Sequence, residues 1–370
     1  MSDTKLWKHQ ISLTTLETLA PRFASQLPGF QVQSFLRHGG AGLDDLELKA
    51  RVQQVAAAAR GAWPGPLAQL IAALPLVGAR KPALSGFSVW PLLQVIEDFG
   101  LPVWQESLAA MHALTGRWSA EFAIRPYLRA DPERALAVLQ RWAADPDEHV
   151  RRLVSEGTRP RLPWGEQLVL FVSEPEHTLP LLELLRADPA EYVRRSVSNH
   201  LNDIAKDHPD RVVDVLGRWQ REAPGPATTW IVRHASRTLI KQGHPGALAL
   251  RGFARPAVVV EAFDVGPDPL DFGGRLQLHA TLRGAAKESQ RWAVDFVMHH
   301  VKANGGRTAK VFKWREVTVA PGAVVSLDKA HAIRAISTRR YYPGLHRVEL
   351  QVNGQVLAGA DFTLQMPAGS

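Results

Sequence analysis

The spacing of apolar residues changes once along the chain, near residue 250. Before that point, apolar positions recur every three or four residues between proline-rich breaks, a pattern that predicts helix after helix. After it, apolar and polar residues alternate and glycine turns follow, which predicts short strands. The segments Asn304–Gly306 and Asn353–Gly354 are typical hairpin turns. About seven strands in roughly 115 residues predict a small sandwich of the immunoglobulin type.

The helical part contains an internal repeat. DPDEHVRRLVSE, starting at Asp145, returns 43 positions later as DPAEYVRRSVSN, starting at Asp188, and a looser copy, TWIVRHASR, starts at Thr229. Two helices in about 40 residues is the period of HEAT-type repeats, which stack into a curved solenoid. The predicted fold is an all-α HEAT-like repeat solenoid followed by an all-β immunoglobulin-like sandwich. We expect three domains, namely a helical capping subdomain, the solenoid and the sandwich, at residues 1–100, 101–252 and 256–370.

One predicted helix, residues 190–206, separates an apolar stripe from a polar ridge. The stripe, which faces the neighbouring helix, consists of Val193, Val197, Leu201 and Ile204. The opposite ridge consists of Arg195, Asn199, Asp203 and Lys206. In the aligned copies, Arg152 and Arg233 take the position of Arg195. Arg237 and Lys241 continue the last ridge without an acid.

A basic ridge repeated along a solenoid suits a phosphate backbone. Guanidinium groups pair bidentately with phosphate, and such contacts give a sequence-independent, salt-dependent affinity. The residues expected to contact phosphates are Arg152, Arg195, Arg233, Arg237 and Lys241. The alternative is a solvated helix face whose charges form local ion pairs.

The segment RWSAEFAIRPYL predicts a helix in which Glu121 sits inside the apolar face, between Trp118 and Phe122 on the helical wheel. Arg125, four residues on, satisfies this carboxylate as a helical ion pair in one interpretation. In the other, the carboxylate is held beside an aromatic wall, where water is scarce and its field is strong.

Trp164 lies in EGTRPRLPWGE, a segment that Pro160 and Pro163 keep out of a helix. Helical packing therefore does not place its indole. The indole is either a hydrophobic plug or an exposed surface that stacks on a base or sugar and attracts a cation.

Composition excludes several classes of protein. The 370 residues include no cysteine, which rules out disulfide scaffolds, zinc ribbons and thiol nucleophiles. Hydrophobic residues make up 45% and charged residues 22%, as in a soluble, core-forming protein. There is no run of about 18 apolar residues, and MSDTKLWKHQ lacks the apolar centre of a secretory signal. We therefore expect a cytoplasmic protein without membrane contact.

The net charge of +8 favours an anionic partner. From Arg255 onward there are fifteen basic and ten acidic residues, so the β-domain contributes +5. Its basic residues gather around the first hairpin and before a tyrosine pair, at Lys302, Lys310, Lys313, Arg315, Arg339 and Arg340. We expect this domain to clasp a polyanionic partner through a groove and phosphates. The alternative is a module for solubility or for binding a protein partner.

Metal and cofactor sites are not predicted. His299 and His300 are adjacent, so in a strand they point to opposite faces and do not share a metal comfortably. The sequence has no Walker or dinucleotide fingerprint and no nucleophile elbow. We therefore expect neither a metal nor a cofactor.

Three segments of the helical part resemble one known family. EFAIRPYL at Glu121, HVRRLVSEGTRPRLPW ending at Trp164 and YVRRSVSNHLNDIAKDHP around Asp203 are similar to the AlkC branch of the HEAT-like-repeat DNA glycosylases. HHVKANG, KVFKWRE, TRRYYPG and HRVELQVNG resemble the immunoglobulin-like extension of many members of that branch. The resemblance covers nearly the whole chain, although the first hundred or so residues carry no matching motif.

This resemblance implies that Glu121, Asp203 and Trp164 belong to the active site. It also implies that the enzyme removes small cationic alkylated bases from duplex DNA, above all 3-methyladenine, with 3-methylcytosine as a second candidate. An N3-alkylated base is already positive, so its glycosidic bond breaks without a general acid, and charge then develops on the sugar. We expect the two acids to share stabilisation of this oxocarbenium ion and positioning of water, while the indole packs on the damaged nucleotide. Which acid activates the water stays open.

No catalytic lysine for strand cleavage is evident, so a monofunctional, monomeric glycosylase without an obligate protein partner is expected. An open solenoid offers no obvious deep pocket, so we expect the DNA to bend and the lesion to be exposed at the concave surface. When bound to DNA, the cytoplasmic enzyme is expected to be associated with the nucleoid. The alternative function is a non-catalytic HEAT-repeat scaffold that binds DNA or a protein. Glu121 and Asp203 discriminate between the two, because carboxylates repel phosphates but stabilise an oxocarbenium ion.

Overall fold

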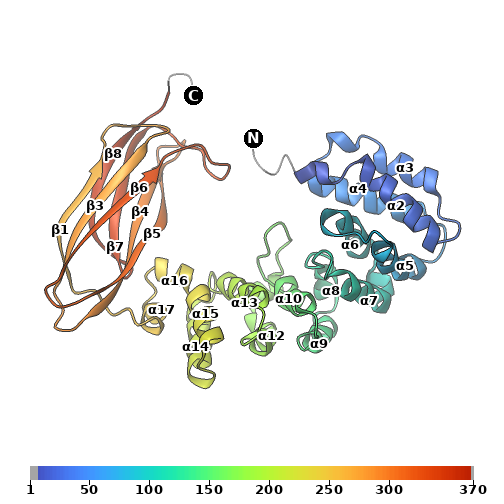
Figure 1. Cartoon of the computed structure of the whole chain (residues 1–370), viewed down its shortest axis with the longest axis horizontal. Helices are drawn as coiled ribbons and strands as arrows, with labels where there is room; N and C mark the ends of the chain where they lie inside the picture. Colours follow the sequence, from blue (N-terminus) through green and yellow to red (C-terminus); the bar gives the residue numbers. More distant parts are fainter. Residues whose placement is uncertain (1–6, 368–370) are drawn as a thin grey trace. The chain divides into compact units, whose positions relative to one another are not determined.

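The computed structural model describes residues 7–367, with a helical part followed by a β-sandwich (Figure 1). Residues 1–6, which belong to the segment examined for a secretory signal, and residues 368–370 lie outside this range. The chain divides into two compact units, Met1–Asp207 and His208–Ser370. No helix within residues 7–367 has both the length and the apolar character needed to cross a membrane.

The described part of the first unit is helical. Short 3-10 turns, such as η3 (Gly86–Val89), connect several of its helices. Its α-helices are α2 (Leu13–Gln26), α3 (Val32–Gly40), α4 (Leu48–Gly61), α5 (Leu67–Ala79), α6 (Trp90–Phe99), α7 (Trp104–Leu114), α8 (Arg125–Ala130), α9 (Pro132–Trp142), α10 (Glu148–Gly157), α11 (Val169–Ser173), α12 (Leu179–Leu185) and α13 (Glu191–Ile204).

Helices α10 and α13 show how the repeated sequence folds. Asp147 caps α10 by accepting a hydrogen bond from the backbone N–H of His149 at 2.8 Å. Helix α13 starts 43 residues after α10, at the same point of the repeat. It packs against α10, and the predicted apolar stripe is confirmed because each of its residues is at most 2% exposed: Val193, Val197, Leu201 and Ile204. The assignment of these helix pairs to HEAT-like repeats stays a prediction.

The second unit combines four helices with a sandwich. Its helices are α14 (Pro209–Glu222), α15 (Pro226–Ala235), α16 (Arg237–Lys241) and α17 (Pro245–Leu250). The third repeat copy is therefore divided between α15 and α16, which Ser236 separates. Its strands are β1 (Val258–Gly266), β2 (Leu270–Asp271), β3 (Arg275–Gly284), β4 (Gln290–Val301), β5 (Arg307–Val319), β6 (Val324–Ala332), β7 (Gly344–Val352) and β8 (Gln355–Gln365).

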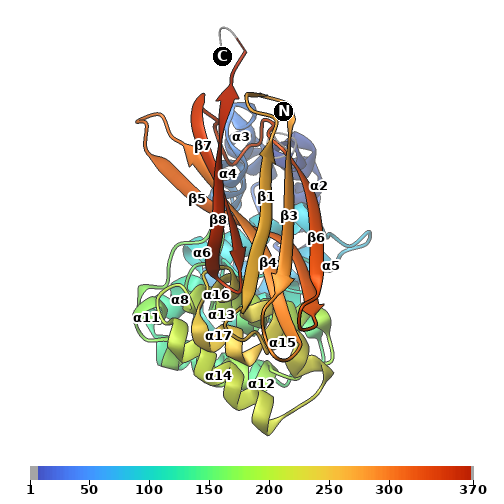
Figure 2. The ribbon, with the colours of Figure 1, turned by 90° about the vertical axis from the view of Figure 1, so that its left-hand side faces the viewer.

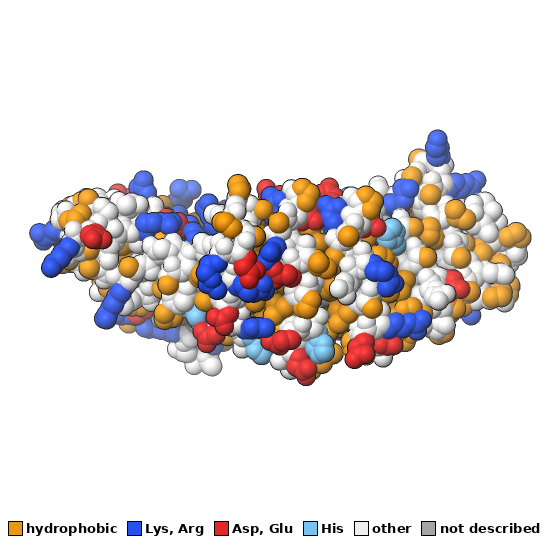
Figure 3. All heavy atoms as spheres, turned by 90° about the horizontal axis from the view of Figure 1, so that it is seen from below, with side chains coloured by type: hydrophobic (Ala, Val, Ile, Leu, Met, Phe, Trp, Pro, Cys, Tyr) orange, Lys and Arg blue, Asp and Glu red, His pale blue; other side chains and the backbone are white. Residues whose placement is uncertain are grey.

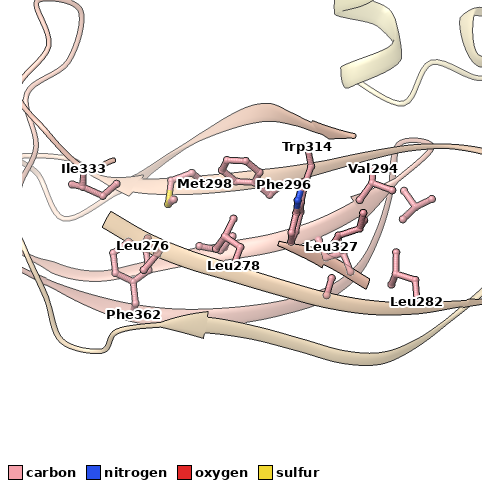
Figure 4. Close-up of a cluster of buried hydrophobic side chains, with 14 of the residues drawn as sticks. Leu276, Leu278, Leu282, Val294, Phe296, Met298, Trp314, Leu327, Ile333 and Phe362 are labelled. Carbon is pink, nitrogen blue, oxygen red and sulfur yellow. The ribbon is translucent and has the colours of Figure 1, made fainter. Parts of the chain in front are cut away.

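The strands form two sheets, in the orders β1-β3-β6 and β2-β8-β7-β4-β5 (Figure 2). The predicted immunoglobulin-like sandwich is confirmed, with the two-residue β2 as an additional strand that pairs in parallel with β8. Both predicted hairpins are present. In the second, Asn353 and Gly354 have φ angles of 46° and 77°, the left-handed conformation that a two-residue hairpin turn needs. Side chains of both sheets, among them Leu278 and Phe296, fill one core (Figure 4).

The last helices belong to the sandwich unit rather than to the other helices. The helical part ends at Leu250, close to the expected domain limit at residue 252, but the compact units separate at Asp207. Hydrogen bonds explain the difference. Gln351 Nε2 donates to the carbonyl of Lys241 at 3.0 Å, and Asn353 Nδ2 donates to that of Ala254 at 2.8 Å.

Candidate active site

Glu121 lies in a turn, not in a helix. The turn spans residues 121–124, and α8 begins only at Arg125. The predicted helix over RWSAEFAIRPYL is therefore wrong. Pro126 accounts for this start, because proline is tolerated in the first turn of a helix but would clash with the preceding turn inside a longer one. The Glu121 side chain is 16% exposed, so it is held against the protein but still reaches solvent.

The cation beside Glu121 is Arg152 of α10, not Arg125. Arg152 Nη1 and Ser119 Oγ both donate to Glu121 Oε2, at 2.7 and 2.8 Å. The guanidinium of Arg125 donates instead to backbone carbonyls within residues 157–166. The hypothesis of a helical Glu121–Arg125 pair is wrong because it depended on a four-residue spacing that only a helix turns into a contact.

Trp164 occupies an exposed loop between α10 and α11. Its φ angle of 65° is unusual for a bulky residue, and such conformations persist only where the surroundings impose them. The indole is 56% exposed and makes an edge contact with Trp7, with ring centroids 6.1 Å apart. It is therefore not a buried plug.

Two arginines fix the loop that carries Trp164. Arg125 is 3% exposed and donates to the carbonyls of Gly157 and Arg159, each at 3.0 Å, and to that of Glu166 at 3.1 Å through Nε. Burial lowers the pKa of Arg125 to about 10, which leaves it charged at neutral pH. On the other side, Arg161 forms a bidentate pair with Asp207, with distances of 2.9 and 3.0 Å. The loop is thus attached to both α8 and the turn that follows α13.

Asp203 is buried in the last turn of α13. Its side chain is 4% exposed, and it accepts hydrogen bonds from Arg159 Nε at 2.7 Å and Lys206 Nζ at 2.9 Å. Asp203 belongs to the predicted polar ridge but is buried there, because Arg159, which follows α10, covers it. Arg195 and Lys206 of the same predicted ridge are exposed.

A chain of alternating charges links the two predicted acids. Arg152, which holds Glu121, also approaches Glu156 Oε1 with its Nη2 at 3.4 Å. Arg159, which holds Asp203, donates to the same Glu156 oxygen at 2.7 Å. The other oxygen of Glu156 accepts from Ser196 Oγ at 2.6 Å. Glu121 and Asp203 therefore stand at the two ends of one ion-pair network.

The sequence prediction missed Glu156, Arg159 and Ser196. Glu156 follows Arg152 by four residues on one helix, so the spacing itself was a signal of this pair. Burial by itself lowers the pKa of Arg152. The negative charges of Glu156 and Glu121 together outweigh this effect, so the pKa of Arg152 lies above its ordinary value. Three carboxylates and two guanidinium groups give the chain a formal charge of −1, which the half-exposed Lys206 offsets at one end.

Arg152 does not match its predicted role as a phosphate ligand. Its guanidinium pairs with Glu121 and Glu156 and lies over the ring of Tyr192, 5.0 Å from the centroid, and its side chain is only 17% exposed. Arg195, at the same repeat position, is 65% exposed and pairs with the exposed Glu191. Arginines at the same repeat position therefore differ in burial and in their partners.

Two cavities flank the aromatic side chains around Glu121. One, of about 340 Å³, is lined by Glu121 and Phe122, together with Arg152 and Tyr192. The other, of about 200 Å³, is lined by Phe122 and Trp164 and by residues of the N-terminal helices. The residue next to Glu121 thus forms part of both walls.

The predicted basic residues of the second unit are mostly exposed. Solvent-exposed positions are Arg233, Arg237, Lys241, Lys302, Lys310, Lys313, Arg315 and Arg340. Arg339 is half-buried and contacts His300 and Tyr341, while Lys313 pairs with Glu316 at 2.5 Å. On the face shown in Figure 3, basic and acidic side chains are interspersed rather than collected in one field. Contacts with DNA stay a prediction. Residues 7–367 contain no group of three His, Asp or Glu side chains placed to hold a metal.

Comparisons with known proteins agree with this architecture. The family "DNA alkylation repair enzyme" matches residues 117–239, and the family "Uncharacterised protein YhaZ, C-terminal Ig-like domain" matches residues 259–366. Uncharacterized protein YhaZ of Bacillus subtilis (strain 168) is 35% identical over 319 residues, which cover 86% of this chain and 87% of that protein.

A solved structure, that of the Pseudomonas fluorescens alkylpurine DNA glycosylase AlkC bound to DNA containing an abasic site analog, is 39% identical. The match covers 97% of this chain and 99% of that one, with a TM-score of 0.91. The matches to the helical part and to the immunoglobulin-like domain thus place this chain in the class of DNA alkylation repair proteins. Within that class, the chain belongs to the AlkC family.

Proposed function

We propose that this protein is a monofunctional DNA glycosylase, which hydrolyses the N-glycosidic bond of small cationic alkylated bases in duplex DNA. Its expected substrate is 3-methyladenine, with 3-methylcytosine as a second substrate. The observation that carries this proposal is the network that joins Glu121 to Asp203. The exposed Trp164 lines a cavity together with Phe122, the residue next to Glu121. The likeness to an alkylpurine DNA glycosylase over nearly the whole chain supports it.

The reaction needs stabilisation of a cation rather than protonation of a base. An alkylated base leaves as a neutral molecule, and the positive charge moves to the deoxyribose as the bond lengthens. A carboxylate about 4 Å from that charge contributes roughly 4 kcal/mol at an effective dielectric constant near 20. Only the part gained in the transition state accelerates the reaction, up to about a thousandfold.

Glu121 is the more accessible of the two acids, with 16% of its side chain exposed against 4% for Asp203. Its hydrogen bonds within residues 7–367 end on Oε2. We therefore assign Oε1 of Glu121 to the contact with water or the sugar. Asp203, held by Arg159 and Lys206, acts at the other end of the network. Trp164 packs on the damaged nucleotide.

The DNA backbone is held by the exposed basic side chains. Arg195 and, in the second unit, Arg233, Arg237 and Lys241 are exposed on helices, and Lys302, Lys310, Lys313 and Arg340 are exposed on the sandwich. The half-buried Arg339 of the sandwich is also expected to contribute. Such contacts give sequence-independent affinity. The sandwich clasps the duplex, and the DNA bends so that the lesion becomes accessible.

The direct test is an assay of base release. We expect the protein to release 3-methyladenine from a duplex that contains this lesion, to leave adenine in a matched undamaged duplex, and to leave the resulting abasic strand uncut. Binding of both duplexes is measured in parallel by fluorescence anisotropy. Tight binding without release would support the scaffold alternative instead, and strand cleavage would contradict a monofunctional enzyme.

A further inference from the structure

A groove between α7 and α9 lies apart from the candidate active site (Figure 1). Its volume is about 560 Å³, which is within the range of ligand-binding pockets. Five residues of each helix line it, and they recur at helical spacing. Among the described residues, the groove shares no lining residue with the two cavities around Glu121. A ligand bound here would therefore not occupy those cavities.

The walls of the groove are largely apolar. On α7, Trp104 and Leu108 form its buried side, with exposed fractions of 9% and 7%. On α9, Ala137, Val138 and Trp142 are more open to solvent. Apolar side chains of a ligand would remove this surface from water, which is favourable in proportion to the area buried. The groove therefore favours a ligand that carries apolar side chains.

Two guanidinium groups border this apolar surface. Arg134 and Arg141 are both exposed and stand seven residues apart on α9, about 10 Å along the helix axis. Arg134 lies over the ring of Trp104, 4.3 Å from the centroid, and Arg141 donates to the carbonyl of Ala137 at 3.1 Å. Neither forms an ion pair within residues 7–367. Since a guanidinium has five N–H donors, both keep donors for a carboxylate.

No carboxylate of the described chain lines the groove. Glu106 of α7 and Glu133 of α9 are exposed, but they lie outside the lining and pair with neither arginine. Asp131 and Asp145, at the two ends of α9, already have partners. Asp131 caps the helix by accepting from its backbone at 3.0 Å, and Asp145 accepts from His112 Nε2 at 2.7 Å. The charge presented inside the groove is therefore positive.

We propose that this groove binds an acidic segment of a partner protein, with apolar side chains between α7 and α9 and carboxylates on Arg134 and Arg141. The lining runs from Trp104 to His112, about 12 Å, which is the length of about four residues in an extended chain. Phosphates of DNA would match the arginines but would leave the apolar walls uncovered. The inference goes beyond the proposed function and adds a partner that base release does not require.

The test uses three synthetic peptides that carry fluorescein at the N-terminus. The first, Gly-Asp-Asp-Leu-Phe-Asp-Asp-Gly, combines an apolar pair with carboxylates on both sides. The second has asparagine in place of every aspartate, and the third has alanine in place of leucine and phenylalanine. Binding to the full-length protein is measured by fluorescence anisotropy. We expect the first peptide to bind at least about tenfold more tightly than either control, because each control lacks one of the two matching features.

Arg134→Gln and Arg141→Gln locate the binding site. Each is expected to weaken binding of the acidic peptide by about three- to tenfold and to leave the affinity for the asparagine peptide unchanged. Arg37→Gln is the matched control, because Arg37 of α3 is likewise exposed and has no ion pair in the described part of the chain, but does not line the groove. It is expected to bind all three peptides as the wild type does. Circular dichroism checks that each variant is folded.

Several outcomes would overturn the proposal. These are no binding of the acidic peptide, equal affinity for it and either control peptide, or an equal loss in Arg37→Gln. Weaker binding of duplex DNA by Arg134→Gln and Arg141→Gln, with peptide binding unchanged, would assign the groove to the DNA interface instead. The base-release assay is independent, and both groove variants are expected to keep the wild-type rate. Failure of the wild type to release a base would reject the proposed function and leave this inference standing.

Discussion

Helices α10 and α13 derive from two copies of one repeat, yet the arginine at the shared repeat position is buried in one helix and exposed in the other. Arg152 on α10 is largely buried between Glu121 and Glu156, whereas Arg195, 43 residues later, is mostly exposed. The same offset takes Glu156 to Asn199 and Arg159 to Asn202. The ion-pair network thus exists around one copy because that copy keeps an acid and a second arginine.

The difference separates two consequences of a repeat sequence. The shared apolar positions determine that both segments form helices with the same buried stripe. The polar positions acquire their roles from the neighbouring elements, here the turn that carries Glu121 and α13 itself. A buried ion pair also differs from an exposed one in energy, because removal of one partner leaves an uncompensated buried charge.

The largest expected effect follows from neutralising the acids of the network. In Glu121→Gln and in Asp203→Asn, the rate of base release under single-turnover conditions is expected to fall by up to about a thousandfold, because the sugar cation loses a carboxylate. Glu191→Gln on α13 is the control and is expected to keep the wild-type rate, since this acid only pairs with Arg195 at the surface. Comparable losses in all three variants would remove the distinction between the two helices.

The same comparison applies to stability. Arg159→Ala is expected to lower the free energy of unfolding by about 3–5 kcal/mol, because Glu156 and Asp203 are left buried without their shared cation. Arg195→Ala is expected to change it by less than about 1 kcal/mol, as for other exposed pairs. Urea unfolding monitored by circular dichroism measures both. Equal effects would show that burial of the network contributes little.

A smaller effect is expected from Arg125, which we infer to be a positioning residue. Arg125→Ala removes the donor to three carbonyls around the Trp164 loop, and a misplaced indole is expected to lower the single-turnover rate by about 100-fold. Affinity for DNA is expected to stay within about threefold, because no phosphate contact is lost. Arg125→Lys, which keeps the charge and part of the hydrogen bonding, should recover part of the rate. A loss of affinity with an unchanged rate would contradict this role.

The smallest effect is expected at the exposed basic positions. Arg233→Ala should weaken binding of any duplex by a few-fold and lower the slope of log K against log salt by about 1, as for one lost phosphate contact. Titrations at several salt concentrations give this slope. An unchanged slope would exclude Arg233 from the DNA interface.

The sequence was informative wherever one periodicity dominated. The apolar stripe from Val193 to Ile204 and the hairpin at Asn353 follow from local patterns, and both are present in the structure. The helix expected around Glu121 is absent, because Pro126 outweighs the apolar spacing. The burial of Asp203 depends on Arg159, which lies 44 residues earlier in the sequence, so helical spacing alone could not reveal it.

The central claim is that Glu121 and Asp203 act on one transition state although different arginines hold them. The most direct test measures single-turnover release of 3-methyladenine by Glu121→Gln, Asp203→Asn and the double variant, with DNA binding checked for each. Groups that act as a unit are strongly non-additive, so the double variant is expected to be about as slow as the slower single variant. A rate loss equal to the product of the two single losses would contradict a shared reaction centre.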